Sequence, residues 1–141
     1  QQLELAIQFN KPVLLHVRRA HAETLRWLKY FKLPRAGIIH AFAGSNEEAK
    51  EYAKLGFKLG IGGAFTHERA QRLRKTLQQL PAEQIVLETD APDMAPAFAL
   101  GQRNSPTHLD KIAELLAELR GETVTDLAHY TTENALSILR A

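Results

Sequence analysis

Short apolar runs alternate with amphipathic stretches along most of this chain. The runs, rich in Val, Ile, Leu and Gly, cover residues 13–17, 37–41, 57–63 and 85–87. Their length and their boundaries at proline, glycine or polar residues predict short buried strands. The last run continues into Glu88, Thr89 and Asp90, and Pro92 ends any strand at about that point because proline cannot donate to a sheet ladder.

The stretches between these runs space their apolar residues as helices do. We expect helices over residues 2–9, 21–31, 46–55, 66–80, 106–120 and 125–139. Ser45 or Asn46 is expected to cap the third helix, Thr66 the fourth, and Thr125 to open the last. Residues 91–106 form a long loop with three prolines, and a loop of this length in a compact domain is usually functional.

The expected elements alternate strand and helix four times and end with two helices. This order predicts an α/β fold with a parallel sheet and right-handed crossovers. The carboxyl ends of parallel strands meet at one edge of the sheet, which is where such folds place their chemistry.

Composition narrows the class of protein. The 141 residues suffice for one domain with a core, and we expect a single domain over residues 1–141. The absence of cysteine excludes disulfides, thiolate zinc sites and cysteine nucleophiles. No apolar run approaches a membrane span, no signal peptide opens the chain, and a cytoplasmic location is expected. The chain begins with Gln1 rather than Met, which suggests a piece of a longer polypeptide.

Charge is unevenly distributed along the chain. Residues 1–80 carry 14 Lys and Arg against 6 Asp and Glu, whereas residues 81–141 carry 4 against 10. This asymmetry fits a basic face for a polyanion beside an acidic region for cations, and it equally fits solvated helix faces.

Three side chains that can bind metal follow the expected strands. His16, His40 and Asp90 stand at strand ends, and imidazole and carboxylate are good ligands for divalent zinc, manganese or iron. A hydrolase uses such an ion to lower the pKa of water, and Asp90 is alternatively a general base. The structural alternative is two hydrogen-bonded histidines and an Asp turn cap. We expect surface or capping roles for the other four histidines.

Six motifs together resemble one family. They are Pro-Val-Leu-Leu-His-Val-Arg-Arg-Ala (12–20), Ile-Ile-His-Ala-Phe-Ala-Gly-Ser (38–45), Leu-Gly-Ile-Gly-Gly (59–63), Leu-Glu-Thr-Asp-Ala-Pro (87–92), Arg-Asn-Ser-Pro (103–106) and Thr-Thr-Glu-Asn-Ala (131–135). In this order they strongly resemble the TatD family of metal-dependent deoxyribonucleases, and the resemblance covers the whole chain.

The resemblance implies a TIM-barrel-type metallo-hydrolase that cleaves DNA phosphodiester bonds, often from the 3′ end. It implies divalent metal ions, two in the full-length protein, with zinc, magnesium or manganese as candidates. By this match His16 and His40 are metal ligands, and Asp90 binds metal or water or acts as the base. Arg18 matches a family arginine that can pair with a substrate phosphate, the alternative being a loop–helix ion pair.

Departures from the family pattern are informative. Members begin with a strand ending in His-x-His and supply a bridging Glu later, and neither feature occurs in these residues. Ala43 replaces a serine, and Asp93-Met94 stands where an aromatic is common. The chain is therefore expected to be the C-terminal half of the barrel, with four of eight strands. Such a half cannot close, so two copies could pair edge to edge.

Two other functions remain open from the sequence. The same metal site could hydrolyse an ester or amide, for example by removing a wrongly attached amino acid from tRNA. A non-catalytic α/β binding domain, in which the histidines are structural, is the alternative outside enzymes.

Overall fold

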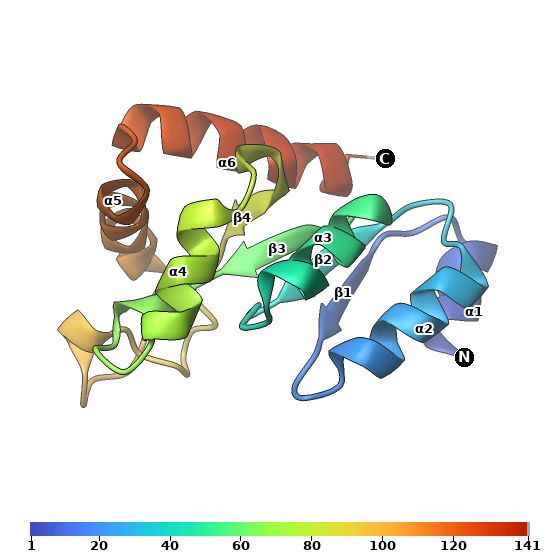
Figure 1. Cartoon of the computed structure of the whole chain (residues 1–141), viewed down its shortest axis with the longest axis horizontal. Coiled ribbons are helices and arrows are strands. Elements are labelled where there is room, and N and C mark those ends of the chain that lie inside the picture. The colour runs from blue at the N-terminus through green and yellow to red at the C-terminus, as the bar shows by residue number, and fades with distance from the viewer. Residues whose placement is uncertain (141) are drawn as a thin grey trace.

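A computed structural model describes residues 1–140 and contains one parallel sheet with strand order β1-β2-β3-β4. The strands are β1 (Val13–His16), β2 (Gly37–His40), β3 (Lys58–Ile61) and β4 (Ile85–Leu87). The α-helices are α1 (Gln2–Gln8), α2 (His21–Phe31), α3 (Asn46–Lys54), α4 (Gln71–Gln79), α5 (Leu109–Arg120) and α6 (Val124–Leu139). Figure 1 shows the strands side by side, with successive helices wrapped around the sheet. The expected α/β order is confirmed.

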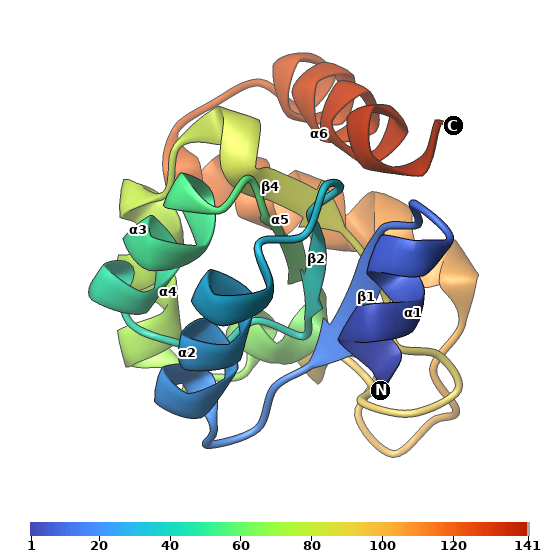
Figure 2. The same ribbon diagram turned by 90° about the vertical axis from the view of Figure 1, so that its right-hand side faces the viewer.

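The main core lies between one face of the sheet and the helices. Ile39, Leu59, Ile61 and Ile85 point into it and are almost fully buried, together with Tyr52 of α3. Figure 2 shows α2, α3 and α4 along this side of the sheet. These alternating apolar positions explain why the strands form, since burial of aliphatic side chains is the dominant favourable term in folding.

The opposite face of the sheet is only partly covered. Side chains alternate along a strand, so Ile38 and Val86 point away from the main core. They form a small cluster with Ile138 of α6. Leu14 also faces this side and remains 64% exposed. We call this surface, at whose carboxyl edge His16 and His40 lie, the open face.

Three helix starts differ from the sequence prediction. α5 begins at Leu109 rather than at residue 106, after a 3₁₀ turn, η4 (Pro106–His108). Thr66 does not cap a helix: it ends a 3₁₀ turn, η1 (Gly63–Thr66), and α4 starts only at Gln71. The Thr66 hydroxyl donates to the Gly63 carbonyl and accepts from the Ala97 amide, so a tertiary contact takes the place of a cap. The last helix begins at Val124 rather than Thr125, because the Thr123 side chain accepts from the Asp126 amide.

The capping of α3 agrees with expectation. The Ser45 hydroxyl accepts from the Glu48 amide, and the Glu48 carboxylate accepts from the Ser45 amide. This reciprocal pair fixes the turn between β2 and α3. Among residues 1–140, no helix is long and apolar enough to cross a membrane.

Candidate metal centre

The two strand-end histidines stand side by side. β1 and β2 pair in a register that sets His16 opposite His40. Their ring centroids are 5.6 Å apart at the carboxyl edge of the open face. The position predicted for them from the strand pattern is therefore the position that they occupy.

Two carboxylates flank His40. Its Nδ1 lies 2.9 Å from Oε2 of Glu88, and its Nε2 lies 3.2 Å from Oδ1 of Asp90. Glu88 is held from a second direction, since its other oxygen accepts from the Ala41 amide at 2.6 Å. Because a carboxylate only accepts, Nδ1 donates to Glu88 and the orientation of the ring is fixed.

Glycine at position 60 makes the approach of Glu88 possible. Glu88 follows β4, His40 ends β2, and β3 runs between these two strands. A Cβ atom at Gly60 would lie 2.2 Å from Oε2 of Glu88. The missing side chain therefore leaves the path by which the carboxylate crosses β3, as expected for a glycine where another group approaches the backbone closely.

The surroundings of His40 shift its pKa. Partial burial lowers this pKa, but the hydrogen bond to Glu88 and the negative charges of Glu88 and Asp90 outweigh the burial. The net result is a pKa above the ordinary 6.5. A bound cation would take the place of the Nε2 proton.

Backbone conformation is unusual at this edge. Arg19, Ala41 and Asp90 have positive φ, between 48° and 57°, and each lies within three residues of the end of a strand. The left-handed region is uncommon for residues other than glycine. Such conformations persist where the surroundings over-determine them, and they cluster at active sites.

The donors of this cluster, imidazole and carboxylate, are of the types that bind divalent cations. Two ligands of one tetrahedral zinc ion, each about 2.0–2.2 Å from the metal, stand roughly 3.3 Å apart. The 3.2 Å between Nε2 of His40 and Oδ1 of Asp90 matches that separation. Within residues 1–140, however, no group of three His, Cys, Asp or Glu side chains forms a ready-made metal site.

The remaining predicted residues have simpler surroundings. Arg18 is exposed just beyond β1, and its side chain forms no ion pair or hydrogen bond with residues 1–140. His21 pairs with the Tyr52 hydroxyl, His67 with the Ala95 carbonyl, and His108 with the Asn104 carboxamide. These three histidines make structural hydrogen bonds, and His129 is exposed on α6.

Glu88 is the residue that sequence reasoning missed at this site. The signal was the spacing, because residues two apart in an extended segment face the same side. Val86 faces the open side of the sheet, so Glu88 does as well. Glu88 and Asp90 therefore both reach His40.

Known structures share this architecture. A crystal structure of YjjV, a TatD homologue from Escherichia coli K12, matches with a TM-score of 0.94 at 38% identity, over 99% of this chain and 54% of that one. A TatD-family hydrolase from Entamoeba histolytica matches with a TM-score of 0.82 at 18% identity, which shows the fold alone. The predicted half-barrel of TIM type is confirmed.

Sequence relatives agree with this likeness. An uncharacterized metal-dependent hydrolase of Haemophilus influenzae is 42% identical over 97% of this chain and 52% of its own length. A protein of Pantoea vagans named 3′-5′ ssDNA/RNA exonuclease TatD is 38% identical over 99% of this chain and 56% of its own length. The chain thus spans about half the length of the curated relatives it matches.

The family profile described as TatD related DNase matches residues 1–140. It extends over all four strands and over every residue of the candidate metal centre. The chain belongs to the TatD-related DNase family.

Proposed function

We propose that this chain supplies part of the active site of a metal-dependent hydrolase that cleaves phosphodiester bonds of single-stranded DNA from the 3′ end. The observation that carries the proposal is His40, held between Glu88 and Asp90 with His16 beside it. This cluster combines nitrogen and oxygen ligands at the strand edge where α/β barrels act.

Relatives support the choice of reaction. The Haemophilus influenzae relative and YjjV of Escherichia coli are both named metal-dependent hydrolases. The Pantoea vagans relative is named an exonuclease for single-stranded DNA and RNA. The family description itself refers to DNase activity.

Each residue of the cluster has a role in this proposal. His16, His40 and Asp90 hold a divalent cation, with zinc, magnesium and manganese as candidates. Such a cation lowers the pKa of a water molecule and polarises a phosphoryl oxygen. Glu88 keeps Nδ1 of His40 protonated, which leaves the Nε2 lone pair for the cation. Asp90 alternatively accepts the proton that the attacking water loses.

Arg18 is assigned to the substrate. Its exposed guanidinium follows His16 by two residues and is free of protein partners within residues 1–140. A guanidinium can hold a phosphate through two parallel hydrogen bonds. It would thus keep the scissile phosphate close to the histidines.

The complete centre needs more than these residues. A three-donor set does not hold two cations, and the relatives are about twice as long as this chain. We expect the remaining half of the barrel to supply the other ligands, including the second cation's. Activity is therefore tested on this chain joined to that half.

The test follows nucleotide release from 3′-labelled single-stranded DNA, with and without a chelator. Asp90→Asn is compared with Asp110→Asn, a matched change on the exposed face of α5. We expect release that requires metal, falls at least a hundredfold with Asp90→Asn, in line with loss of a catalytic acid–base group, and is unchanged by Asp110→Asn.

Two outcomes would contradict this proposal and support another function. Folded, metal-loaded protein that leaves DNA intact but hydrolyses aminoacyl esters would identify an ester hydrolase instead. Absence of both activities and of metal binding would identify a binding domain with structural histidines.

A further inference from the structure

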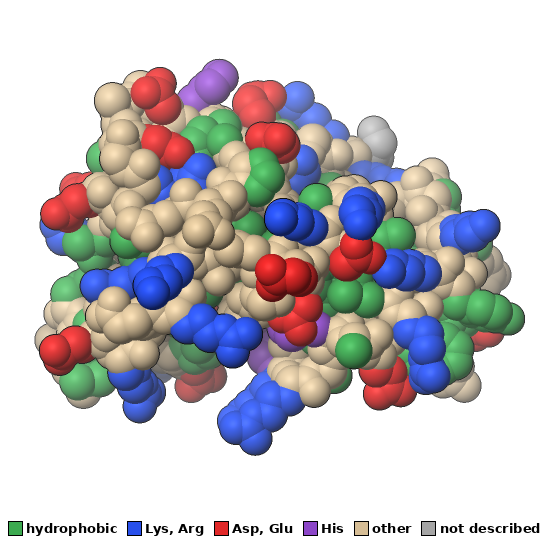
Figure 3. Space-filling view, viewed as in Figure 1, with side chains coloured by type: hydrophobic (Ala, Val, Ile, Leu, Met, Phe, Trp, Pro, Cys, Tyr) green, Lys and Arg blue, Asp and Glu red, His purple; other side chains and the backbone are tan. Residues whose placement is uncertain are grey.

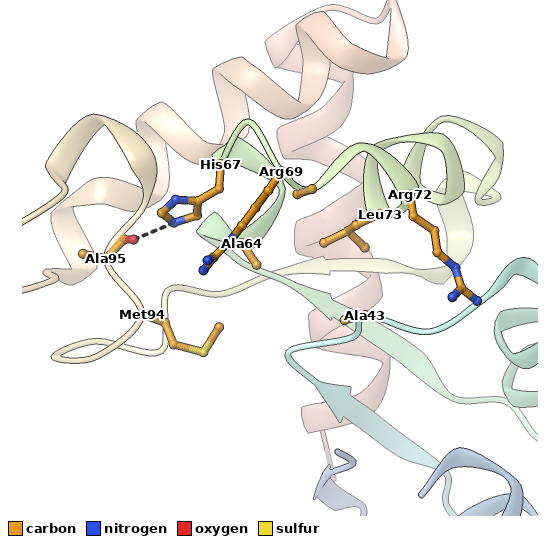
Figure 4. A pocket seen from close by; sticks show the side chains of 9 residues that line it. Ala43, Ala64, His67, Arg69, Arg72, Leu73, Met94 and Ala95 are labelled. Carbon is orange, nitrogen blue, oxygen red and sulfur yellow. Dashed lines mark hydrogen bonds between the residues drawn. The ribbon is translucent and has the colours of Figure 1, made fainter. Parts of the chain in front are cut away.

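A cavity of about 560 Å³ lies beside the candidate metal centre, between the loop that follows β4 and the start of α4. Its lining is Ala43, Ala64, His67, Arg69, Ala70, Arg72, Leu73, Met94 and Ala95. Figure 4 shows Met94 and Ala95 on the loop side, with Arg69 beside Ala64 and Arg72 at the end away from Ala95. We call this cavity the Arg69 pocket.

The Arg69 pocket lies next to residues of the metal centre. A smaller cavity lined by Glu88, Thr89 and Asp90 shares Ala64, Leu73 and Met94 with it. The smaller cavity has a volume of only about 20 Å³, and the two cavities share a wall. A substrate whose reacting bond lies at Asp90 has its neighbouring group within reach of the pocket.

Hydrogen bonds between the walls hold the pocket open. The His67 ring pairs with the Ala95 carbonyl at 3.1 Å, and the Thr66 hydroxyl accepts from the Ala97 amide at 2.8 Å. Both bonds tie the segment before α4 to the loop after β4. The pocket is thus formed in the free protein, as ligand sites usually are.

The lining combines two kinds of surface. Small alanines, Leu73 and the flexible Met94 give an apolar floor suited to a flat ring. The guanidinium groups of Arg69 and Arg72 form no ion pair or hydrogen bond within residues 1–140. The charge of Arg72 lowers the pKa of the exposed Glu47 carboxyl, after larger hydrogen-bond contributions, which places one acid nearby. Both guanidinium groups are therefore available to an anion, and Arg69 lies beside the apolar floor.

An apolar floor beside unpaired guanidinium groups matches a nucleotide. The base would lie on the floor, and a phosphate would pair with arginine. The volume falls within the roughly 300–1,000 Å³ of small-molecule sites. Figure 3 shows other Lys and Arg side chains over α2, α3 and α4, with Asp and Glu side chains among them.

We propose that the Arg69 pocket binds the nucleotide next to the scissile bond of single-stranded DNA, with Arg69 and Arg72 on its phosphate. This inference rests on the proposed function for its substrate class. The pocket itself consists only of residues of this chain and needs no metal, so binding can be tested separately from hydrolysis.

The test titrates deoxyadenosine monophosphate, deoxyadenosine and inorganic phosphate into this chain joined to the other half of the barrel, kept metal-free with a chelator, and follows binding by calorimetry and by amide shifts. We expect the nucleotide to bind at least tenfold more tightly than the nucleoside or phosphate. Arg69→Gln should remove about tenfold of that affinity, as expected for one lost charge-assisted contact. The control is Arg26→Gln, a 70% exposed side chain on α2, which should change nothing.

The pocket assignment fails if nucleotide and nucleoside bind equally, if Arg69→Gln binds like the unaltered chain, or if nothing binds. In the completed barrel, a raised KM for DNA with kcat preserved in Arg69→Gln would support it. Arg69-dependent nucleotide binding without DNA hydrolysis would retain the pocket and reject the nuclease. DNA hydrolysis by a protein whose nucleotide binding does not depend on Arg69 would retain the nuclease and reject the pocket.

Discussion

The side-chain amide of Asn104 donates to the backbone carbonyl of Thr89 at 2.5 Å. The same amide donates to the Asp93 carbonyl at 2.7 Å, and its oxygen accepts from the Ser105 amide. Asn104 is 4% exposed, so these bonds are shielded from water. One buried side chain therefore fixes the peptide that precedes Asp90 and closes the loop around it.

Asn104→Ala should destabilise the protein and loosen the Asp90 loop. The carbonyls of Thr89 and Asp93 and the amide of Ser105 would lose a partly buried hydrogen bond each, at a total cost of about 2–3 kcal/mol. Urea unfolding gives the free energy. Gln102→Ala, an exposed position in the same loop, is the control and should cost at most about 0.5 kcal/mol. Equal effects of the two changes would contradict this role.

Gly60→Ala should break the contact between Glu88 and His40 while the protein still folds. The added Cβ would meet the carboxylate end of a flexible side chain, which can turn away. The pKa of His40 should then fall toward its ordinary value, as read from its ring proton shifts. In an E88Q background, Gly60→Ala should change the pKa of His40 little further, because changes at interacting sites are not additive. If the two changes shifted the pKa of His40 additively, Gly60→Ala would not act through Glu88.

Stability should depend on pH through His40. Its pKa is raised in the folded state, so folding favours the imidazolium. The contribution is complete below the unfolded pKa of about 6.5 and disappears as pH rises through the folded value. Unfolding with a chelator should show the difference between unaltered protein and His40→Gln shrinking at higher pH. A stability difference between the two proteins that grows with pH would contradict a raised pKa of His40 in the folded state.

The chain on its own should self-associate. β1 and β4 each pair on one side only, and Leu14 exposes 64% of its surface on the open face. Unpaired edges and exposed apolar side chains favour association with another chain. Sedimentation velocity should show dimers or larger species that Leu14→Lys reduces. Leu139→Lys, an exposed change on α6, should leave them intact; a monomer at every concentration would refute the expectation.

Sequence alone was enough to place the strands, because alternating burial and strand-ending histidines are local patterns. His16 and His40 were predicted to meet because parallel strands share one edge. The start of α4 was wrong, since Thr66 bonds to Ala97, which lies far along the chain. The spacing of Val86 and Glu88 could have placed the Glu88 carboxylate on the open face, but its contact with His40 across β3 depends on Gly60. Contacts between distant segments leave no periodic signal.

In the proposed function, His16, His40 and Asp90 share a divalent cation. The most direct measurement is anomalous diffraction from crystals of the completed barrel soaked in manganese or zinc. We expect a peak about 2.0–2.2 Å from Nε2 of His40 and from an Asp90 oxygen, with His16 as a further ligand. A metal-loaded crystal whose peaks all lie away from these three residues would contradict the claim.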